Sequence, residues 1–220
     1  MSKVTIIGAG AVGSTIAYTM VVNGIASEIV MIDVNEEKAL GEAMDIRQGT
    51  PFCSPVSIYA GSYRDAVGSD IVIITSGVAR KPGQTRIDLA QTNVCIIKYI
   101  APNITKYAPN AVYILVANPV DILTYVFTKV SGLPERQVIG SGTILDTARL
   151  RARLSEYLRI SQKNVHAYVF GEHGDTSSVP WSKTYISAVP ISEYARTMKS
   201  SGIQVKPINK AEMLTYVQKS

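Results

Sequence analysis

The sequence predicts an α/β fold, a doubly wound parallel sheet followed by an incomplete α+β domain. Short β-branched runs alternate with helical stretches, and the runs are almost continuously apolar, as in a parallel sheet covered on both faces. Crossovers between parallel strands are right-handed, so these runs form a doubly wound sheet. The pattern changes after Gly142, where an Arg-rich helix and a more polar remainder follow. We therefore expect a dinucleotide-binding domain over residues 1–141 and a second, catalytic domain over 142–220.

The expected elements follow one another along the chain. The strands are Lys3–Ile7, Glu28–Asp33, the weaker Val56–Tyr59, Ile71–Thr75, Val112–Ala117, Val138–Gly140 and Val165–Phe170. The helices are Val12–Asn23, Glu36–Arg47, Ile87–Tyr107 with a break or bend near Pro102, Asp146–Leu158 and Ala211–Lys219. The last helical pattern stops without a C-cap signal, so we expect a chain truncated at its C-terminus.

Composition argues against several classes of protein. Of the 220 residues, 46% are hydrophobic and 18% charged, which is typical of a folded domain with a buried core. The net charge is +5, and its basic residues are scattered, so we expect no nucleic-acid partner. Apolar runs stay below the roughly 18 residues of a membrane span, and the chain begins with a strand instead of a signal peptide. Cys53 and Cys95 lack a CxxC spacing, which favours a reducing compartment and hence the cytoplasm.

A glycine-rich turn between the first strand and first helix predicts a dinucleotide site. In Gly8-Ala9-Gly10-Ala11-Val12-Gly13, the first glycine allows a tight turn, the second lets the backbone approach a pyrophosphate, and the third lets helix pack on strand. Asp33 ends the next strand, where it can bind a ribose diol and repel a 2′-phosphate, so NAD is favoured over NADP. The motif alone is weak, but here strand, helix and acid are in register. The expected cofactor residues are Gly8, Gly10, Ala11, Val12, Gly13 and Asp33.

The two histidines of the chain, His166 and His173, lie close together in the sequence. His173 lies in GEHGD, a loop just past a strand end, where flanking glycines leave an imidazole accessible for proton transfer. The alternative is an ordinary solvated loop histidine. We expect no metal site, because neither a partner histidine at ligand spacing nor a nearby cysteine accompanies it.

The segment DTARLRAR strengthens the catalytic interpretation of His173. On a helix, Asp146 and Arg149 are i,i+3 neighbours, whereas Arg151 points roughly 200° away from Arg149 and should serve a different site. The alternative for the first pair is a surface ion pair. Arg153 also falls near the Arg149 face, so spacing alone does not distinguish the two arginines.

Two loops at strand ends complete the candidate residues. The segment Thr75–Arg86 carries two glycines, a proline and three cations before a long helix, which is typical of a lid that delivers positive charge, although ordinary loop chemistry is an equal alternative. Asn118-Pro119 follows the Val112–Ala117 strand, and ligands of open α/β sheets bind at such carboxyl ends.

In order along the chain, GAGAVGSTIAY, IVMIDVN, ARKPGQTRIDL, VANPVDILTY, GSGTILDTARLR and GEHGD resemble the lactate/malate dehydrogenase family, and specifically its L-lactate branch. The resemblance covers essentially the whole chain, and a colinear set is far more specific than the first motif alone. It implies a Rossmann domain and reversible hydride transfer between NADH and pyruvate, giving L-lactate. Family members are longer, so these residues alone are expected to bind NAD weakly and turn over poorly.

The resemblance also implies a role for each candidate residue. His173 matches the acid/base that protonates the forming alkoxide, and Asp146 matches the carboxylate that orients the imidazole and stabilises its cation. Arg149 matches the fork that binds the substrate carboxylate. Arg86 matches the lid arginine that polarises the reacting carbonyl, and Asn118 matches the residue that hydrogen-bonds near the substrate oxygen and nicotinamide.

Two further matches concern regulation and specificity. Arg151 and His166 match the pair that binds a phosphate of fructose 1,6-bisphosphate in regulated bacterial members of the family. These members are usually homotetramers. The alternative is that the two residues have a structural role. Arg80 departs from the lactate pattern, because lactate enzymes usually carry Gln there, whereas malate enzymes use Arg for the second carboxylate of oxaloacetate. Lactate oxidoreduction is therefore the first hypothesis. Malate oxidoreduction and a non-catalytic NAD-binding module are the alternatives.

Overall fold

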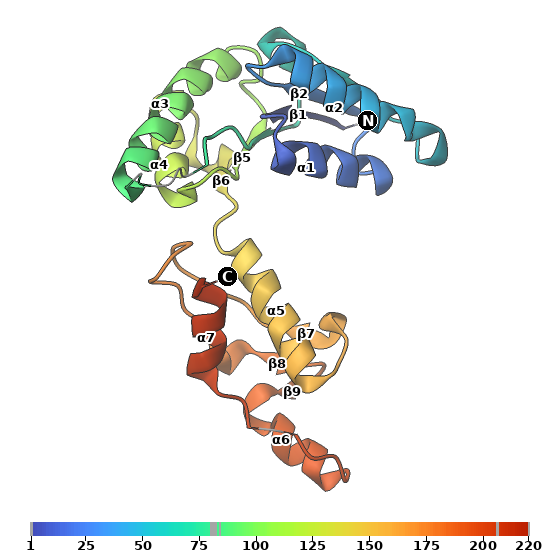
Figure 1. The fold of residues 1–220 in the computed structure, drawn as a ribbon, viewed down its shortest axis with the longest axis vertical. Helices are drawn as coiled ribbons and strands as arrows, with labels where there is room; N and C mark the ends of the chain where they lie inside the picture. Colours follow the sequence, from blue (N-terminus) through green and yellow to red (C-terminus); the bar gives the residue numbers. More distant parts are fainter. Residues whose placement is uncertain (1, 80–82, 84, 206, 220) are drawn as a thin grey trace. The chain divides into compact units, whose positions relative to one another are not determined.

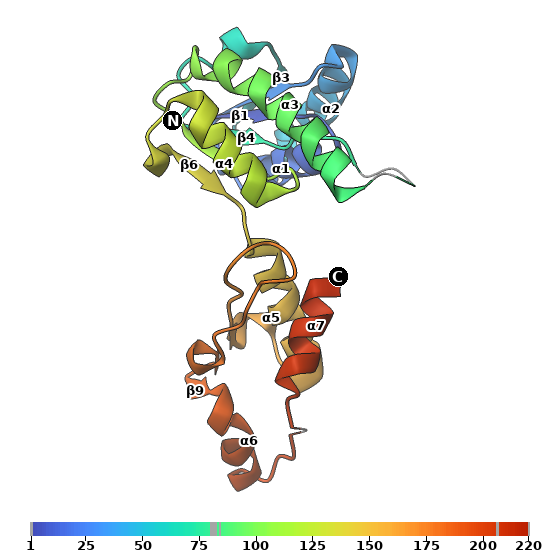
Figure 2. The same cartoon turned by 90° about the vertical axis from the view of Figure 1, so that its left-hand side faces the viewer.

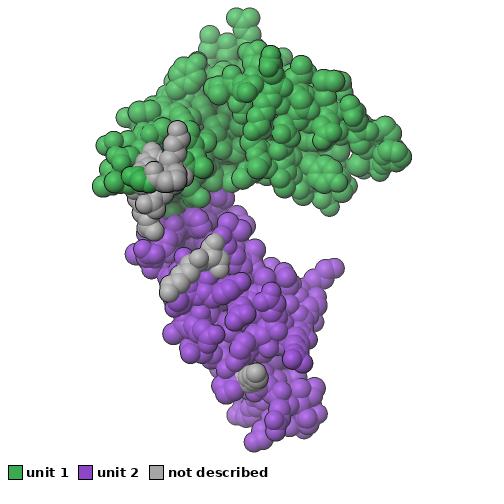
Figure 3. Space-filling model, viewed as in Figure 1, with its two compact units in different colours: residues 1–140 green, residues 141–220 purple. Residues whose placement is uncertain are grey.

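The computed structural model describes residues 2–79, 83, 85–205 and 207–219 of the chain, with the side chains of Arg86 and Lys219 left aside. The chain divides into two compact units, residues 1–140 and 141–220, and the division falls one residue before the expected domain boundary (Figure 3).

Unit 1 contains a six-stranded parallel sheet with the order β3-β2-β1-β4-β5-β6. This is the strand order of the doubly wound fold, which confirms the expected architecture. The strands are β1 Lys3–Ile7, β2 Glu28–Ile32, β3 Ser57–Ala60, β4 Ile71–Ile74, β5 Val112–Leu115 and β6 Val138–Gly140.

Helices pack on both faces of this sheet (Figures 1 and 2). They are α1 Ala11–Val22, α2 Glu36–Gln48, α3 Arg86–Thr105 and α4 Val120–Ser131. Neighbouring strand residues alternate between two cores: Ile6 packs with α1 and α2, and Ile7 packs with α3 and α4. The sheet is therefore buried on both sides, which explains why its strands are almost uniformly apolar.

Two helical features of unit 1 differ from the sequence expectation. α3 continues through Pro102, where we expected a break or bend. α4 was not predicted, although it begins directly after Pro119, where the fixed φ of proline suits a helix start. Its β-branched residues obscured the helical pattern, but Leu123 and Phe127, one turn apart, are both fully buried.

Unit 2 combines three helices with a small antiparallel sheet. These are α5 Ile144–Leu158, β7 Val165–His166, β8 Tyr185–Ile186, β9 Val189–Pro190, α6 Ile191–Ser200 and α7 Lys210–Lys219. Leu150 and Leu154 of α5 pack with Met213 and Val217 of α7 in a separate core. Single-turn 3-10 helices occur in both units, at Thr50–Phe52, Tyr63–Ala66, Glu135–Gln137, Gln162–Asn164 and Trp181–Lys183. In the part of the chain that the structure describes, every helix is too short or too polar to cross a membrane.

The predicted strand Val165–Phe170 is wrong beyond His166. The Val169 N–H donates to Thr147 Oγ1 at 3.0 Å, and its carbonyl accepts from Thr143 Oγ1 at 2.6 Å. Phe170 then forms an isolated bridge with Ser178. The backbone of Val169 therefore bonds to side chains near the start of α5 and not to a neighbouring strand. The periodicity of the sequence gives no sign of such side-chain bonds.

A polar cluster ties together three strands at the amino-terminal edge of the sheet. Glu28 Oε1 lies 2.9 Å from Lys3 Nζ and accepts a hydrogen bond from Tyr59 Oη at 2.6 Å. The Tyr59 bond and then Lys3 lower the pKa of the Glu28 carboxyl. Burial, followed by the hydrogen bond to Glu28, raises the pKa of the Tyr59 phenol to about 12.

We predict that Tyr59→Phe lowers the free energy of unfolding by about 1 kcal/mol at neutral pH, because the phenol bond to Glu28 is lost. The pKa of Tyr59 is raised in the folded protein, so this contribution is complete below pH 10 and disappears as the pH rises towards about 12. Urea unfolding of both proteins across this range measures the difference. A difference that stays constant up to pH 12 would contradict the assignment.

Candidate active site

Two glycines of the Gly-rich turn are required by the packing of unit 1 itself. Gly8 has φ +111°, and a Cβ there would lie 2.5 Å from Thr75 Oγ1, which donates a hydrogen bond to the Gly8 carbonyl. A Cβ on Gly13 would lie 1.8 Å from the same carbonyl oxygen. Helix α1 can therefore approach β1 only because position 13 has no side chain.

Gly10 is different, because the fold does not require it. Its φ of −75° suits any residue, and among the described residues no atom lies within 4 Å of where its Cβ would be. Gly10 is the N-cap of α1, so Ala11 and Val12 begin a helix whose first N–H groups are not covered by a capping side chain. Open space above a helix N-terminus is compatible with a pyrophosphate group, and the assignment of Gly10 to a cofactor stays a prediction.

Asp33 follows β2 and holds the same turn. Its Oδ2 accepts a hydrogen bond from the Ala9 N–H at 2.6 Å, and its Oδ1 accepts one from the Asn35 N–H at 2.9 Å. The carboxylate is thus fixed beside the glycines and retains lone pairs that can accept bonds from a ribose diol. The sequence predicted the position of Asp33 but not its bond to Ala9.

Asn118 lies past the carboxyl end of β5, as predicted. Its side chain is exposed, its peptide bond to Pro119 is cis, and its carbonyl accepts a hydrogen bond from Asn93 Nδ2 at 2.7 Å. Of the two arginines that the sequence analysis assigned to a lid, Arg80 lies outside the described residues. Arg86 is the first residue of α3, directly after the N-cap Thr85, and the structure describes its backbone only.

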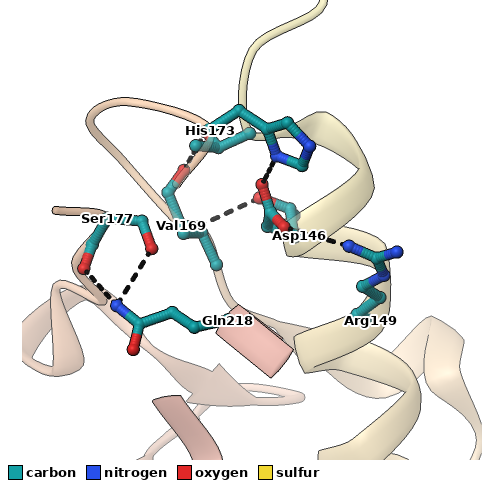
Figure 4. Close-up of polar contacts among 8 residues, drawn as sticks. Asp146, Arg149, Val169, His173, Ser177 and Gln218 are labelled. Atoms are coloured by element: carbon teal, nitrogen blue, oxygen red, sulfur yellow. Dashed lines mark hydrogen bonds and ion pairs between the residues drawn. The ribbon is translucent and has the colours of Figure 1, made fainter. Parts of the chain in front are cut away.

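In unit 2, the predicted acid and base are in direct contact (Figure 4). His173 Nδ1 lies 2.6 Å from Asp146 Oδ2, and Arg149 Nη1 donates to Asp146 Oδ1 at 3.3 Å. Asp146 is only 4% exposed, whereas His173 and Arg149 are partly exposed. A buried carboxylate requires charged or hydrogen-bonding partners, and here it has both an imidazole and a guanidinium.

The loop that carries His173 is held at both ends (Figure 4). Before it, Val169 is bonded to two threonines near the start of α5. After it, Gln218 Nε2 of α7 donates to the Ser177 carbonyl at 3.4 Å and to the Asp175 carbonyl at 3.0 Å. The imidazole therefore approaches the helix from a loop anchored in the body of unit 2.

The structure also distinguishes the three arginines of α5. Arg149 contacts Asp146, whereas Arg153 contacts Glu156 and Glu212 and stacks on the Tyr216 ring, with its guanidinium carbon 4.9 Å from the ring centroid. Arg153 thus joins α5 to α7, which spacing alone did not reveal.

Arg151 Nη2 donates to the Gln162 carbonyl at 3.2 Å, and His166 is exposed on β7. Arg151 therefore contacts the turn that leads into the strand of His166, apart from the Asp146 cluster.

Within the described ranges, no group of three or more His, Cys, Asp or Glu side chains is arranged to hold a metal ion.

Comparisons with known proteins follow the same division. Residues 2–140 match the lactate/malate dehydrogenase NAD-binding domain, and residues 143–218 match the lactate/malate dehydrogenase alpha/beta C-terminal domain. An L-lactate dehydrogenase of Thermoanaerobacter sp. (strain X514) is 53% identical over 194 residues, which are 88% of this chain and 62% of that protein. The chain thus spans less than two thirds of the length of this relative.

Solved structures show the same fold. A lactate dehydrogenase from a Medee basin deep-sea metagenome library superimposes with a TM-score of 0.91 at 43% identity, covering 99% of this chain and 68% of that one. The malate dehydrogenase of Picrophilus torridus, in its apo form, gives a TM-score of 0.88 at 33% identity, covering 99% and 66%.

We predict that alanine at Gly10 affects NADH binding, whereas alanine at Gly13 affects the stability of the protein. Gly10→Ala should keep the stability of the protein but weaken NADH binding by about 1.4 kcal/mol, or tenfold, because the new methyl group points into open space. Gly13→Ala should lower the free energy of unfolding by about 1–3 kcal/mol, because its Cβ collides with the Gly8 carbonyl. Urea unfolding and NADH fluorescence titration measure both quantities. Unchanged NADH affinity in a stable Gly10→Ala protein would contradict the pyrophosphate assignment.

Proposed function

This chain belongs to the lactate/malate dehydrogenase family, and we propose that the protein is an NAD-dependent L-lactate dehydrogenase that interconverts pyruvate and L-lactate. The observation that carries the proposal is the contact of His173 with buried Asp146, beside Arg149. An imidazole held by a carboxylate can transfer a proton, and an adjacent guanidinium can bind an acid. Reduction of a 2-oxo acid requires a proton donor for the carbonyl oxygen and a cation that binds the carboxylate.

The chemistry at His173 follows from which ring nitrogen is engaged. Nδ1 faces Asp146, so Nε2 is the atom that gives a proton to the substrate oxygen during reduction and takes it back during oxidation. Asp146 fixes the ring orientation and balances the positive charge of the protonated imidazole. Arg149 binds the substrate carboxylate through its guanidinium group, which sets the direction of the reacting carbonyl.

Unit 1 supplies the cofactor residues of the proposal. When bound, NAD(H) carries the hydride that is exchanged with the substrate carbon. Its pyrophosphate fits the open space at Gly10, and its adenosine ribose fits the Asp33 carboxylate, which disfavours a 2′-phosphate by charge. Asn118 then binds near the nicotinamide and the substrate oxygen, and Arg86 polarises the carbonyl.

Malate dehydrogenase is the competing function, because Arg80 can pair with a second substrate carboxylate. Among the solved structures, the lactate dehydrogenase is 43% identical and the malate dehydrogenase 33%, each over 99% of this chain, which supports pyruvate as the substrate. The decisive experiment compares kcat/KM for pyruvate and oxaloacetate with NADH and purified protein. A larger value for oxaloacetate overturns the lactate assignment, and NADH binding without turnover of either acid supports a non-catalytic module.

The proposal extends to regulation and setting. Arg151 and His166 form an anion site for fructose 1,6-bisphosphate, supported by the contact of Arg151 with the turn that leads into β7. The active form is a homotetramer. The two free thiols, Cys53 and Cys95, are compatible with a reducing cytoplasm.

We predict that His173→Ala lowers kcat with pyruvate by about 10²–10⁴-fold, the usual contribution of a positioned acid/base group. NADH affinity should stay near that of the unmodified protein, because the cofactor residues belong to unit 1. Stopped-flow turnover and NADH fluorescence measure the two effects. Turnover that survives the substitution would show that another group transfers the proton.

Arg80 provides a second prediction. Arg80→Gln should lower the ratio of kcat/KM for oxaloacetate to that for pyruvate by on the order of 10²-fold, because a buried carboxylate would lose its charged partner. Steady-state kinetics with both acids gives the ratio, and Arg64→Gln, a charge change outside the proposed site, serves as the control. If the ratio does not change, Arg80 does not contact the substrate side chain.

A further inference from the structure

The strands β4 and β5 separate near their carboxyl ends, where the candidate residues lie. Their ladder runs from Ile71 to Ile74 on β4, and the last backbone bonds join the Val116 N–H to the Ile74 carbonyl at 2.9 Å and the Ala117 N–H to it at 3.4 Å. Beyond this point the chain from β4 continues through Val78 towards α3, and the chain from β5 continues to Asn118. Neither Val78 nor Asn118 belongs to the ladder.

One side chain connects these two segments. Asn93 Oδ1 accepts the Val78 N–H at 2.9 Å, and Asn93 Nδ2 donates to the Asn118 carbonyl at 2.7 Å. A longer contact of 3.4 Å joins Nδ2 to the Val78 carbonyl. The Asn93 amide thus supplies hydrogen-bond partners to both segments beyond the end of the sheet.

The surroundings show that this amide occupies a fitted site. Asn93 is a polar residue on the apolar face of α3, one turn before Ile97 and two before Ile100, and it is only 1% exposed. A buried amide is unfavourable unless its polar atoms are bonded. Gly77 packs beside it, since a Cβ there would be in van der Waals contact with Asn93 Nδ2 and Oδ1, both at 3.4 Å. Bonding and packing together fix the orientation of the amide.

We propose that Asn93 is a positioning residue that locks the segment after β4 to the Asn118 loop. The inference rests on the proposed function, in which Asn118 binds near the reacting atoms and the segment after β4 leads to Arg86. Asn93 fixes the backbone of Asn118 through its carbonyl and fixes the start of the lid segment through the Val78 N–H. Asn93 itself is buried, and its amide is bonded to these two segments.

The test compares Asn93→Ala with Asn103→Ala. Asn103 is a matched control, because it lies on the same helix, is partly exposed, and donates to the Tyr99 carbonyl of its own helix. We expect Asn93→Ala to speed hydrogen exchange of the Val78 amide and lower kcat with pyruvate by up to about 10²-fold, the effect of a displaced catalytic group. NADH affinity should change by less than the turnover does.

The bonds of Asn93 to Val78 and to Asn118 together form a clamp between the two segments. Asn93→Asp tests these two bonds separately and keeps the size of the side chain. When ionised, the carboxylate of this variant still accepts the Val78 N–H but cannot donate to the Asn118 carbonyl. Burial raises the pKa of such a carboxyl, so the variant and the unmodified protein are compared well above neutral pH. We therefore expect Val78 to remain protected while kcat falls. This variant also answers the question if Asn93→Ala does not fold.

The outcomes are distinct. Equal Val78 exchange in Asn93→Ala and unmodified protein, or equal kcat in Asn93→Ala and Asn103→Ala, overturns the clamp. Loss of Val78 protection and of turnover in Asn93→Ala alone supports it. If unmodified protein reduces no 2-oxo acid, the proposed function fails, and amide exchange then decides by itself whether Asn93 joins the two segments.

Discussion

The bond between His173 and Asp146 is the interaction on which the proposed chemistry depends. Asp146 is buried, so its carboxylate must be compensated, and the 2.6 Å contact with Nδ1 and the 3.3 Å contact with Arg149 provide the partners. In the proposed function, the bond assigns Nδ1 to Asp146 and Nε2 to proton transfer. One contact therefore compensates a buried charge and selects the nitrogen that the proposal uses.

Residues at the start of α5 build most of this arrangement. Thr143 is the N-cap, and together with Thr147 it binds the Val169 backbone just before the loop that carries His173. Asp146 and Arg149 follow on the same helix, one turn apart. The helix thus bonds to the imidazole of His173 and also to the backbone of Val169, just before the His173 loop. These bonds to Val169 explain why the strand ends at His166 and does not continue to Phe170.

In unit 1, single polar side chains perform a similar task where the sheet ends. Asp33 bonds the Ala9 N–H of the glycine turn, and Asn93 bonds the two segments that continue from β4 and β5. Loops at the carboxyl ends of strands lack ladder partners, so side chains must satisfy their backbone groups. These bonds fix the backbone at the positions to which the proposal assigns cofactor binding.

The sequence predicted the features that depend on local pattern or motif. Alternating strands and helices indicated the sheet, and the glycine spacing identified positions that the packing does require, Gly8 and Gly13. Asp146 and His173, distant in sequence, were paired only through the family resemblance. What periodicity missed depends on contacts between distant residues: Asn93 gives no signal of its bonds to Val78 and Asn118.

The same limit explains the ambiguity at α5. Helical spacing placed Arg149 and Arg153 on nearly the same face and could not separate them. Glu212 and Tyr216, far along the chain on α7, engage Arg153 and leave the Asp146 contact to Arg149. Such assignments require the packed structure, because the deciding partners come from another helix.

The tautomer of His173 tests the central claim most directly. The chain has two histidines, so ¹⁵N NMR spectra of the protein and of a His166→Gln variant assign the ring signals. At a pH where the imidazole is neutral, we expect a protonated Nδ1, donating to Asp146, and an unprotonated Nε2. A neutral ring protonated at Nε2 would contradict it, because Asp146 would then not hold the imidazole in the orientation that proton transfer requires.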